Sequence, residues 1–230
     1  MTRLREARFG GRSKVTAACV WTGDRYGIDY VARLRAMVGR YLRIEHRFIC
    51  LTDHGAVPDG VERIEVPAIG LNGWWAKMAL FAPAVRGAGR CLYLDLDTVV
   101  VGDLSPLAQG PEQFAICRNF HADSRIKSGR RWCAYGSCVM TFPDGWGEEI
   151  WRRFLADRNG YMTLSRWGDQ GAIELLVPDA MILQDVLPPG YFVHYKTIPP
   201  ARPDTAAVVV FGGKARPHDC AVPWVREAWR

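Results

Sequence analysis

The segment Cys91–Val101, which reads CLYLDLDTVVV, is apolar on both sides of two aspartates, Asp95 and Asp97. The run Arg90–Leu94 predicts a short buried strand that ends where Asp95 begins. On extended backbone, side chains at positions i and i+2 point to the same side, so the two carboxylates are expected to face one way. They repel each other unless a cation lies between them, although they could also do no more than cap a turn. A hard divalent ion with open positions for phosphate oxygens would relieve this repulsion, and the segment therefore predicts a metal site.

Strand and helix signals alternate ahead of this segment. Strand candidates lie at Val15–Trp21, Arg47–Thr52 and Val61–Val66, and helix candidates lie at Ile28–Leu42 and, capped by Asn72, at Trp74–Val85. This order predicts an α/β fold in which helices flank a mostly parallel central sheet. Ligands bind at the carboxyl ends of the strands in such sheets, which is where Asp95 and Asp97 are expected.

The second half of the chain is less regular. Asn119–Trp132 is polar and basic and predicts a long loop. Further strands are expected at Ala115–Cys117, Gly136–Phe142, Met181–Leu183, Val193–Tyr195 and Val208–Phe211, and further helices at Trp146–Arg158 and Asp169–Val177. We predict one domain over residues 1–230, with a small irregular C-terminal part and a flexible basic tail over residues 1–13.

Composition and charge exclude several classes of protein. The 230 residues carry 30 Lys and Arg against 24 Asp and Glu, a net charge of +6, and 49% are hydrophobic, which is typical of a globular chain. The longest stretch without a charged residue, Trp132–Pro143, has 12 residues, whereas a membrane span needs roughly 18 or more. The arginines are scattered along the chain, so we expect no nucleic-acid partner.

The cysteines and the N-terminus bear on location. Seven cysteines, an odd number without a C-x-x-C pair, predict a reduced cytoplasmic protein and disfavour a zinc site. Met1–Lys14 carries four arginines and lacks the apolar core of a secretory signal. It is either a solvated tail or a peripheral contact with the inner face of a membrane.

Further segments place the aspartate motif in a wider pattern. Trp75–Phe81, which contains Lys77, precedes the strand, and Gly102-Asp103-Leu104 follows it. Together these segments resemble the core of GT-A-fold glycosyltransferases related to glycosyltransferase family 8. Other motifs of the family are matched in the same order by Trp21–Gly27, Gly136–Met140, Asp169-Gln170 and Phe211–His218. The resemblance spans about residues 15–220 and implies a GT-A-like, Rossmann-like fold.

The resemblance also implies an activity: a metal-dependent transferase that moves a sugar from a nucleotide-sugar, here a UDP-sugar, to a glycan, a lipid-linked acceptor or a small molecule. It implies Asp95 and Asp97 as ligands of Mn²⁺ or Mg²⁺, Asp169 and Gln170 at the transferred sugar, and nucleotide-sugar contacts from Thr22, Tyr26, Asp53, Lys77, Asp95, Lys214 and Arg216. Two of these residues have simpler alternatives, because Lys77 could be a solvated helix lysine and Asp169 a helix N-cap. Family 8 enzymes retain the anomeric configuration, but the sequence shows neither a nucleophile nor a base, so Asp123 and Asp169 are the carboxylates to test.

The late loop departs from the family pattern. Related enzymes carry a metal-binding histidine there, whereas this chain has Val210-Phe211-Gly212. His218 is the nearby imidazole, and it either completes the metal site or is an ordinary surface residue. Lys214 and Arg216 are expected to clamp the diphosphate, because guanidinium groups bind phosphate in a bidentate manner.

Two other functions fit part of the sequence. Asp95–Val99 also matches the nucleophile motif of haloacid-dehalogenase-like phosphatases, in which Asp95 would be phosphorylated and Asp97 would be the acid/base. That motif normally ends the first strand of its fold, whereas three strand candidates precede it here. The second alternative is a catalytically inactive GT-A-like nucleotide-binding protein, which the missing late histidine favours.

Overall fold

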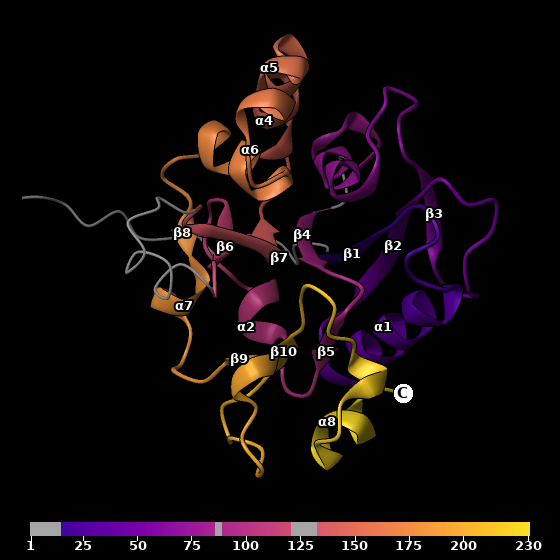
Figure 1. Ribbon diagram of the computed structural model, residues 1–230, viewed down its shortest axis with the longest axis vertical. Coiled ribbons are helices and arrows are strands. Elements are labelled where there is room, and N and C mark those ends of the chain that lie inside the picture. The colour runs from indigo at the N-terminus through magenta and orange to yellow at the C-terminus, as the bar shows by residue number, and fades with distance from the viewer. Residues whose placement is uncertain (1–14, 86–88, 121–132) are drawn as a thin grey trace, which may run out of the picture.

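In the computed structural model, the structure describes residues 15–85, 89–120 and 133–230, so the predicted tail over residues 1–13 and most of the predicted loop over Asn119–Trp132 lie outside the described residues. A seven-stranded sheet crosses the molecule in the order β3-β2-β1-β4-β7-β6-β8 (Figure 1). Its strands are β1 Val15–Trp21, β2 His46–Thr52, β3 Glu62–Glu65, β4 Arg90–Leu94, β6 Ala115–Arg118, β7 Tyr135–Phe142 and β8 Met181–Ile182. Of these strands β7 runs antiparallel to its neighbours β4 and β6, and the other pairs are parallel. The mostly parallel α/β sheet predicted from the sequence is confirmed.

A second, three-stranded sheet has the order β5-β10-β9. It is built from β5 Thr98–Val100, which directly follows the aspartate motif, β9 Phe192–His194 and β10 Val208–Val210. The chain therefore leaves the main sheet at Asp95 and enters the small sheet at Thr98. The two aspartates lie at the junction of the two sheets.

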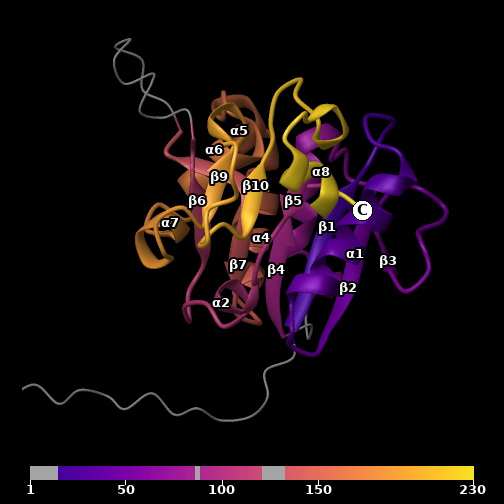
Figure 2. The same ribbon diagram turned by 90° about the horizontal axis from the view of Figure 1, so that it is seen from below.

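Helices cover both faces of the main sheet (Figures 1 and 2). Below it in Figure 1 lie the small sheet, α1 Ile28–Tyr41, α2 Ser105–Ala108 and α8 Pro223–Ala228; above it lie α4 Gly147–Ala156, α5 Arg158–Leu164 and α6 Asp169–Leu176. A short helix, α7 Leu183–Val186, follows β8, and 3₁₀ turns occupy Tyr195–Thr197 and Pro217–Asp219.

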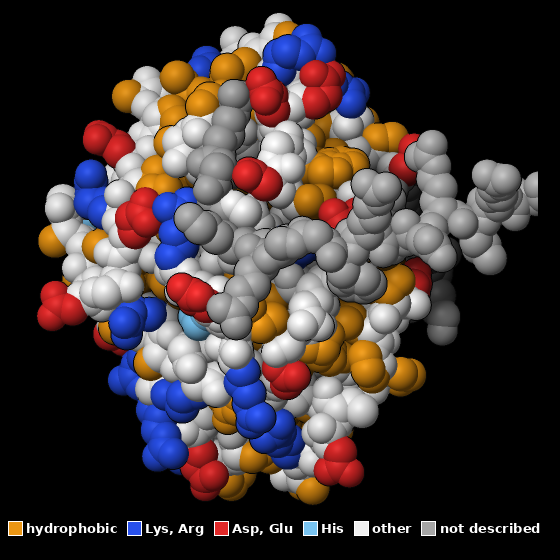
Figure 3. All heavy atoms as spheres, turned by 180° about the vertical axis from the view of Figure 1, so that it is seen from behind, with side chains coloured by type: hydrophobic (Ala, Val, Ile, Leu, Met, Phe, Trp, Pro, Cys, Tyr) orange, Lys and Arg blue, Asp and Glu red, His pale blue; other side chains and the backbone are white. Residues whose placement is uncertain are grey.

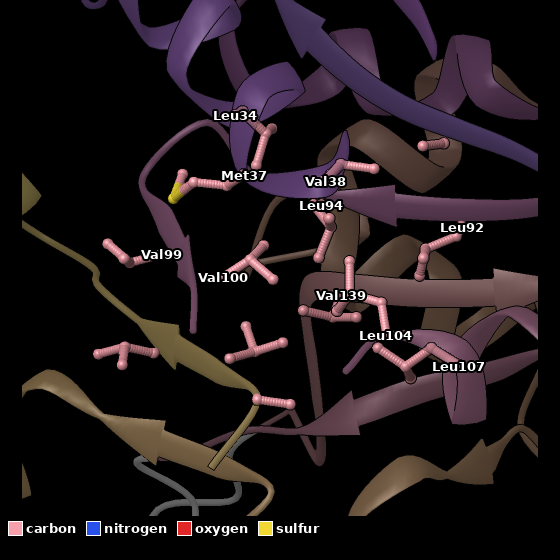
Figure 4. Close-up of a cluster of buried hydrophobic side chains, with 14 of the residues drawn as sticks. Leu34, Met37, Val38, Leu92, Leu94, Val99, Val100, Leu104, Leu107 and Val139 are labelled. Carbon is pink, nitrogen blue, oxygen red and sulfur yellow. The ribbon is translucent and has the colours of Figure 1, made fainter. Parts of the chain in front are cut away.

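The alternation of side chains along β4 divides the core in two. Leu92 and Leu94 point to the face that α1, β5 and β10 cover, where they meet Leu34, Met37, Val99 and Val100 (Figure 4). Cys91 and Tyr93 belong to the cluster on the opposite face, which the Gly73–Phe81 helix, α4 and α6 cover. Each fully buried Leu or Val contributes roughly 1.5–3 kcal/mol. Asp95 continues the Cys91–Tyr93 series, so its carboxylate is directed toward the helices of the second face.

Four predictions about local structure were wrong. The helix expected over Trp74–Val85 is two 3₁₀ helices, Gly73–Phe81 and Pro83–Val85, and the side chain of Asn72 does not cap the first. Pro83 explains the break, because the residue before a proline avoids the helical region and Ala82 is extended, with ψ 156°. The other two errors concern strand ends: Leu183 begins α7, and Tyr195 begins the 3₁₀ turn Tyr195–Thr197, although each was expected to end a strand.

The surface carries the positive charge unevenly. On the face seen from behind, Lys and Arg side chains gather most densely at the lower left of the view (Figure 3). Within the described residues, no helix is both long enough and apolar enough to span a bilayer.

Candidate active site

A cavity of about 690 Å³ opens at the carboxyl ends of β1 and β4. Its lining includes five parts of the fold besides the Gly73–Phe81 helix: the turn after β1, the aspartate motif, the start of β7, the residues around the start of α6, and the end of β10. These parts contribute Thr22 and Tyr26; Asp95 and Asp97; Ser137 and Cys138; Arg166 to Gln170; and Val210 to Gly213. Seven of the eleven site residues predicted from the sequence line this cavity: Thr22, Tyr26, Lys77, Asp95, Asp97, Asp169 and Gln170.

Lys77 binds two carboxylates on the floor of the cavity. Its Nζ lies 2.9 Å from Asp95 Oδ1 and 3.4 Å from Asp169 Oδ2, and it donates to Ser137 Oγ at 3.0 Å. The Ser137 hydroxyl donates in turn to Asp169, and the Tyr93 hydroxyl donates to Asp95 Oδ1 at 2.5 Å. Burial lowers the pKa of Lys77, but the charges of Asp169 and Asp95 outweigh burial and raise that pKa above its usual value. Lys77 is therefore a charged group held between two carboxylates and not a solvated helix lysine.

Asp169 does not cap α6. Gly168 is the N-cap residue and Asp169 is the first residue of the helix, with its buried carboxylate turned to Ser137 and Lys77. Burial raises the pKa of Asp169, while Lys77 and Ser137 lower it. A buried carboxylate needs such partners, since an unpaired one is costly.

Asp97 carries negative charge that its neighbours compensate only in part. Tyr26 donates to its Oδ2 at 2.7 Å, and Arg216 Nη1 lies 4.0 Å from the same oxygen. Burial and the charge of Asp95 raise the pKa of Asp97 to about 6, although Tyr26, Lys77 and Arg216 oppose that shift. Two neighbouring carboxylates that repel each other at a cavity are suited to bind a hard divalent cation. Such a cation takes its other ligands from phosphate or water oxygens.

Two residues that follow β2 hold the turn after β1 in place. Both carboxylate oxygens of Asp53 lie 3.3 Å from the Gly23 backbone N–H, and His54 stacks on Trp21 with ring centroids 3.8 Å apart. Asp53 is not among the residues that line the cavity. In the structure it shapes the turn that carries Thr22 and Tyr26.

Comparison with known proteins identifies the fold. No family model matches the chain, and neither does any curated protein sequence. A structure of an active-site mutant of LgtC matches with TM-score 0.65 and 13% identity, over 92% of this chain and 93% of LgtC. The galactosyltransferase LgtC in complex with donor and acceptor sugar analogues matches with TM-score 0.61 and 14% identity, again over 92% of this chain and 93% of LgtC. The apo glycosyltransferase GlyE of Streptococcus pneumoniae TIGR4 matches with TM-score 0.65 and 20% identity, over 93% of this chain and 59% of GlyE. The chain has a GT-A-like fold. The fold expected from the aspartate motif and its neighbours is confirmed.

The late loop of this GT-A-like fold does not bring His218 to the aspartates. The His218 Nδ1 is hydrogen-bonded to the Tyr30 hydroxyl at 2.6 Å, and its Nε2 lies 3.5 Å from Asp219. Over residues 15–85, 89–120 and 133–230, no group of three or more His, Cys, Asp or Glu side chains is placed to hold a metal ion. His218 is thus not assembled with Asp95 and Asp97 in this conformation, because Tyr30 on α1 holds it elsewhere.

The same loop reaches the cavity through its glycines. Gly212 and Gly213 line the cavity, whereas Lys214 is exposed and is not among the lining residues. Arg25 Nη2 donates to the Gly213 carbonyl at 2.6 Å, and the Arg216 guanidinium lies 5.2 Å from the centre of the Tyr26 ring. Arg25 and Tyr26 therefore hold the loop beside Asp97, and of the two expected diphosphate clamps Arg216 is the one near the motif.

Several cavity residues of the GT-A-like fold had no sequence signal or were assigned no role. Phe120 and His194 line the cavity and stack with centroids 5.2 Å apart, although they are distant in sequence and share no motif. Ser137 lies in the predicted strand Gly136–Phe142, and a polar side chain in a mostly apolar strand is the sequence signal that could have identified it as a site residue. Trp74 lines the cavity and remains 60% exposed.

Proposed function

We propose that the protein is a metal-dependent glycosyltransferase that transfers a sugar from a UDP-sugar to an acceptor, with Mn²⁺ or Mg²⁺ held by Asp95 and Asp97. The observation that carries this proposal is a pair of carboxylates at the carboxyl end of β4. Their negative charge is only partly neutralised by neighbouring groups, and they line a large cavity in a GT-A-like fold. LgtC has been observed with donor and acceptor sugar analogues, and one of its active-site mutants replaces a glutamine by glutamate. Gln170 lines the cavity of the present chain, which supports its assignment to the transferred sugar.

The chemistry follows from where charge develops. Breaking the bond between the anomeric carbon and the diphosphate oxygen leaves positive character on the sugar and negative charge on the departing diphosphate. The ion supplies electrostatic stabilisation of that leaving group when it is bound. Arg216 Nη1 lies 4.0 Å from Asp97 and donates to the carbonyls of Gly213 and Ala215, and we assign the rest of the guanidinium to the diphosphate oxygens.

The remaining polar residues organise the site. Tyr26 orients Asp97, and Lys77 holds Asp95 and Asp169 in fixed positions. We assign Asp169 and Gln170 to the sugar and Thr22 to the nucleotide. We also place the protein in the cytoplasm, because all seven cysteines are free thiols.

The phosphatase alternative has less support. Three strands precede β4 in the chain, and the fold matches glycosyltransferases. The inactive nucleotide-binding protein is favoured by one observation, the placement of His218 away from the aspartates.

Calorimetry with UDP, with and without Mn²⁺, separates these functions. We expect UDP to bind only when Mn²⁺ is present, and Asp97→Asn to abolish the Mn²⁺-dependent part. Asp204→Asn, an exposed aspartate outside the cavity, is the matched control and should bind as the wild type does. Hydrolysis of p-nitrophenyl phosphate that Asp95→Asn abolishes would support the phosphatase instead. UDP binding without loss of sugar from any donor in a UDP-sugar panel would identify the inactive binding protein.

A further inference from the structure

Two large apolar side chains are highly exposed: Trp74, which lines the cavity, and Leu164, which lies close in sequence to a lining residue. Leu164 is 72% exposed and Trp74 is 60% exposed, the two highest values among the large hydrophobic side chains that the structure describes. Exposing an apolar side chain of this size forgoes roughly 1.5–3 kcal/mol of burial. Arg166, also exposed, lies two residues after Leu164 and lines the cavity. We call Trp74, Leu164 and Arg166 the rim patch.

The contacts around these residues make the rim patch one surface. Gly168 adopts φ +64°, and a Cβ placed there would lie 2.6 Å from the Trp74 indole nitrogen, so the backbone at Gly168 is in close contact with Trp74. Ser165 Oγ donates to the Gly168 carbonyl at 2.5 Å, which fixes the turn between Leu164 and Gly168. At the other end of α5, Arg158 donates to the Ile69 carbonyl, just before the Gly73–Phe81 helix. The two segments are therefore joined at both ends.

The charge of these two segments has one sign. Gly70–Ala82 and Arg158–Gly168 contain no Asp or Glu, and the second segment carries Arg158 and Arg166. It is flanked by Asp157, which caps the far end of α5, and by Asp169, which is buried. The rim patch combines exposed Trp and Leu with Arg and contains no carboxylate. This composition is typical of protein surfaces that enter the interface of an anionic membrane. There the Trp lies at the headgroup level, the aliphatic side chain lies among the acyl chains, and the guanidinium binds the lipid phosphates. A saccharide could stack on Trp74 but would leave Leu164 in water.

We propose that the rim patch docks on a bilayer containing anionic phospholipid. Docking there turns the mouth of the cavity toward the membrane, where an acceptor carried on a lipid can reach Gln170 and the aspartates. The docking itself does not depend on the transferase activity; the lipid-linked acceptor rests on the proposed function.

Vesicle flotation tests the docking. We expect the full chain to float with vesicles of phosphatidylcholine mixed with phosphatidylglycerol, and much less with phosphatidylcholine alone. Leu164→Gln should weaken the apparent affinity for the mixed vesicles on the order of tenfold, since one inserted aliphatic side chain is lost. Val186→Gln is the matched control, because Val186 is 51% exposed on α7, away from the cavity, and it should float as the wild type does.

Two results would overturn the proposal: absence of flotation with the mixed vesicles, or equal flotation of Leu164→Gln and the wild type, which would place the contact elsewhere, for example in the basic residues 1–14. Calorimetry of UDP and Mn²⁺ binding to Leu164→Gln distinguishes a failure of membrane docking from a failure of the proposed function. Leu164 does not line the cavity, so its replacement should leave nucleotide binding unchanged.

Discussion

At the scale of single residues, the pKa of Asp97 links pH to metal binding. Burial and the charge of Asp95 raise that pKa to about 6, so the carboxylate takes up a proton more readily than an ordinary aspartate does. A metal ligand must be deprotonated, and we expect the affinity for Mn²⁺ to be constant above about pH 6 and to fall by up to about tenfold per pH unit below it. Titration calorimetry on either side of pH 6 measures this.

The same pKa has the opposite effect on the stability of the metal-free protein. The folded state binds this proton more tightly than the unfolded state, so acidification from neutral pH toward about pH 5 should add stability through Asp97. The melting temperature of the wild type should therefore rise relative to that of Asp97→Asn over this range. A parallel course of the two proteins would contradict the assignment.

Lys77 offers a second test at this scale. Lys77→Met removes the cation between Asp95 and Asp169 and leaves two carboxylates without it on the cavity floor. Breaking a buried pair in this way costs about 3–5 kcal/mol, which denaturant unfolding would detect. Part of the loss should be recovered as the pH falls, because Asp169 can then protonate, and Lys77→Arg should be much closer to the wild type. A loss below about 1 kcal/mol in the methionine variant would show that Lys77 is solvated after all.

At the scale of elements, Gly168 connects α6 to the rim of the cavity. It has φ +64°, and a Cβ would meet the Trp74 indole. Gly168→Ala should cost about 1–3 kcal/mol of backbone strain and also displace Trp74. Gly213→Ala is the control, since Gly213 has φ +67°, no atom within 4 Å of a Cβ and no tryptophan beside it in the sequence. We expect both variants to lose stability, but only Gly168→Ala to change tryptophan fluorescence; identical spectra would disprove the contact.

The elements also show how far sequence patterns reach. The strands β1, β2 and β4, the helix α1 and the aspartate motif could be predicted, because each has a strong local period or a flanking apolar run. The placement of His218 could not, since it depends on a hydrogen bond to Tyr30, 188 residues away. Likewise Lys77 was expected to face phosphates, but its contact with Asp169 arises only when the Gly73–Phe81 helix packs on α6. Local pattern determines which groups are present, and long-range packing determines which of them meet.

At the scale of the whole molecule, the C-terminus is part of the core around α1. Trp229 is 6% exposed and packs edge-on against Tyr30 at 5.1 Å, while Arg33 and Arg40 of α1 donate to the carbonyls of Trp229 and Ala228 at 2.9 Å and 2.7 Å. Tyr30 also holds His218, so the C-terminal segment supports the late loop beside Asp97. The apolar cluster that contains Trp229 extends through both sheets.

This continuity predicts that the chain unfolds as one unit. Trp229→Ala should lower the free energy of unfolding by about 3–5 kcal/mol, as expected for a buried aromatic residue, and keep a single transition because the small sheet and the main sheet share one cluster. Trp146→Ala should cost less, because Trp146 is 37% exposed and packs against Phe114 on the opposite side of the main sheet. Calorimetry of both variants checks this. A second transition at lower temperature in Trp229→Ala would mean that the C-terminal segment and the small sheet unfold separately from the main sheet. The late loop would then lose its support while the main sheet and its two aspartates were still folded.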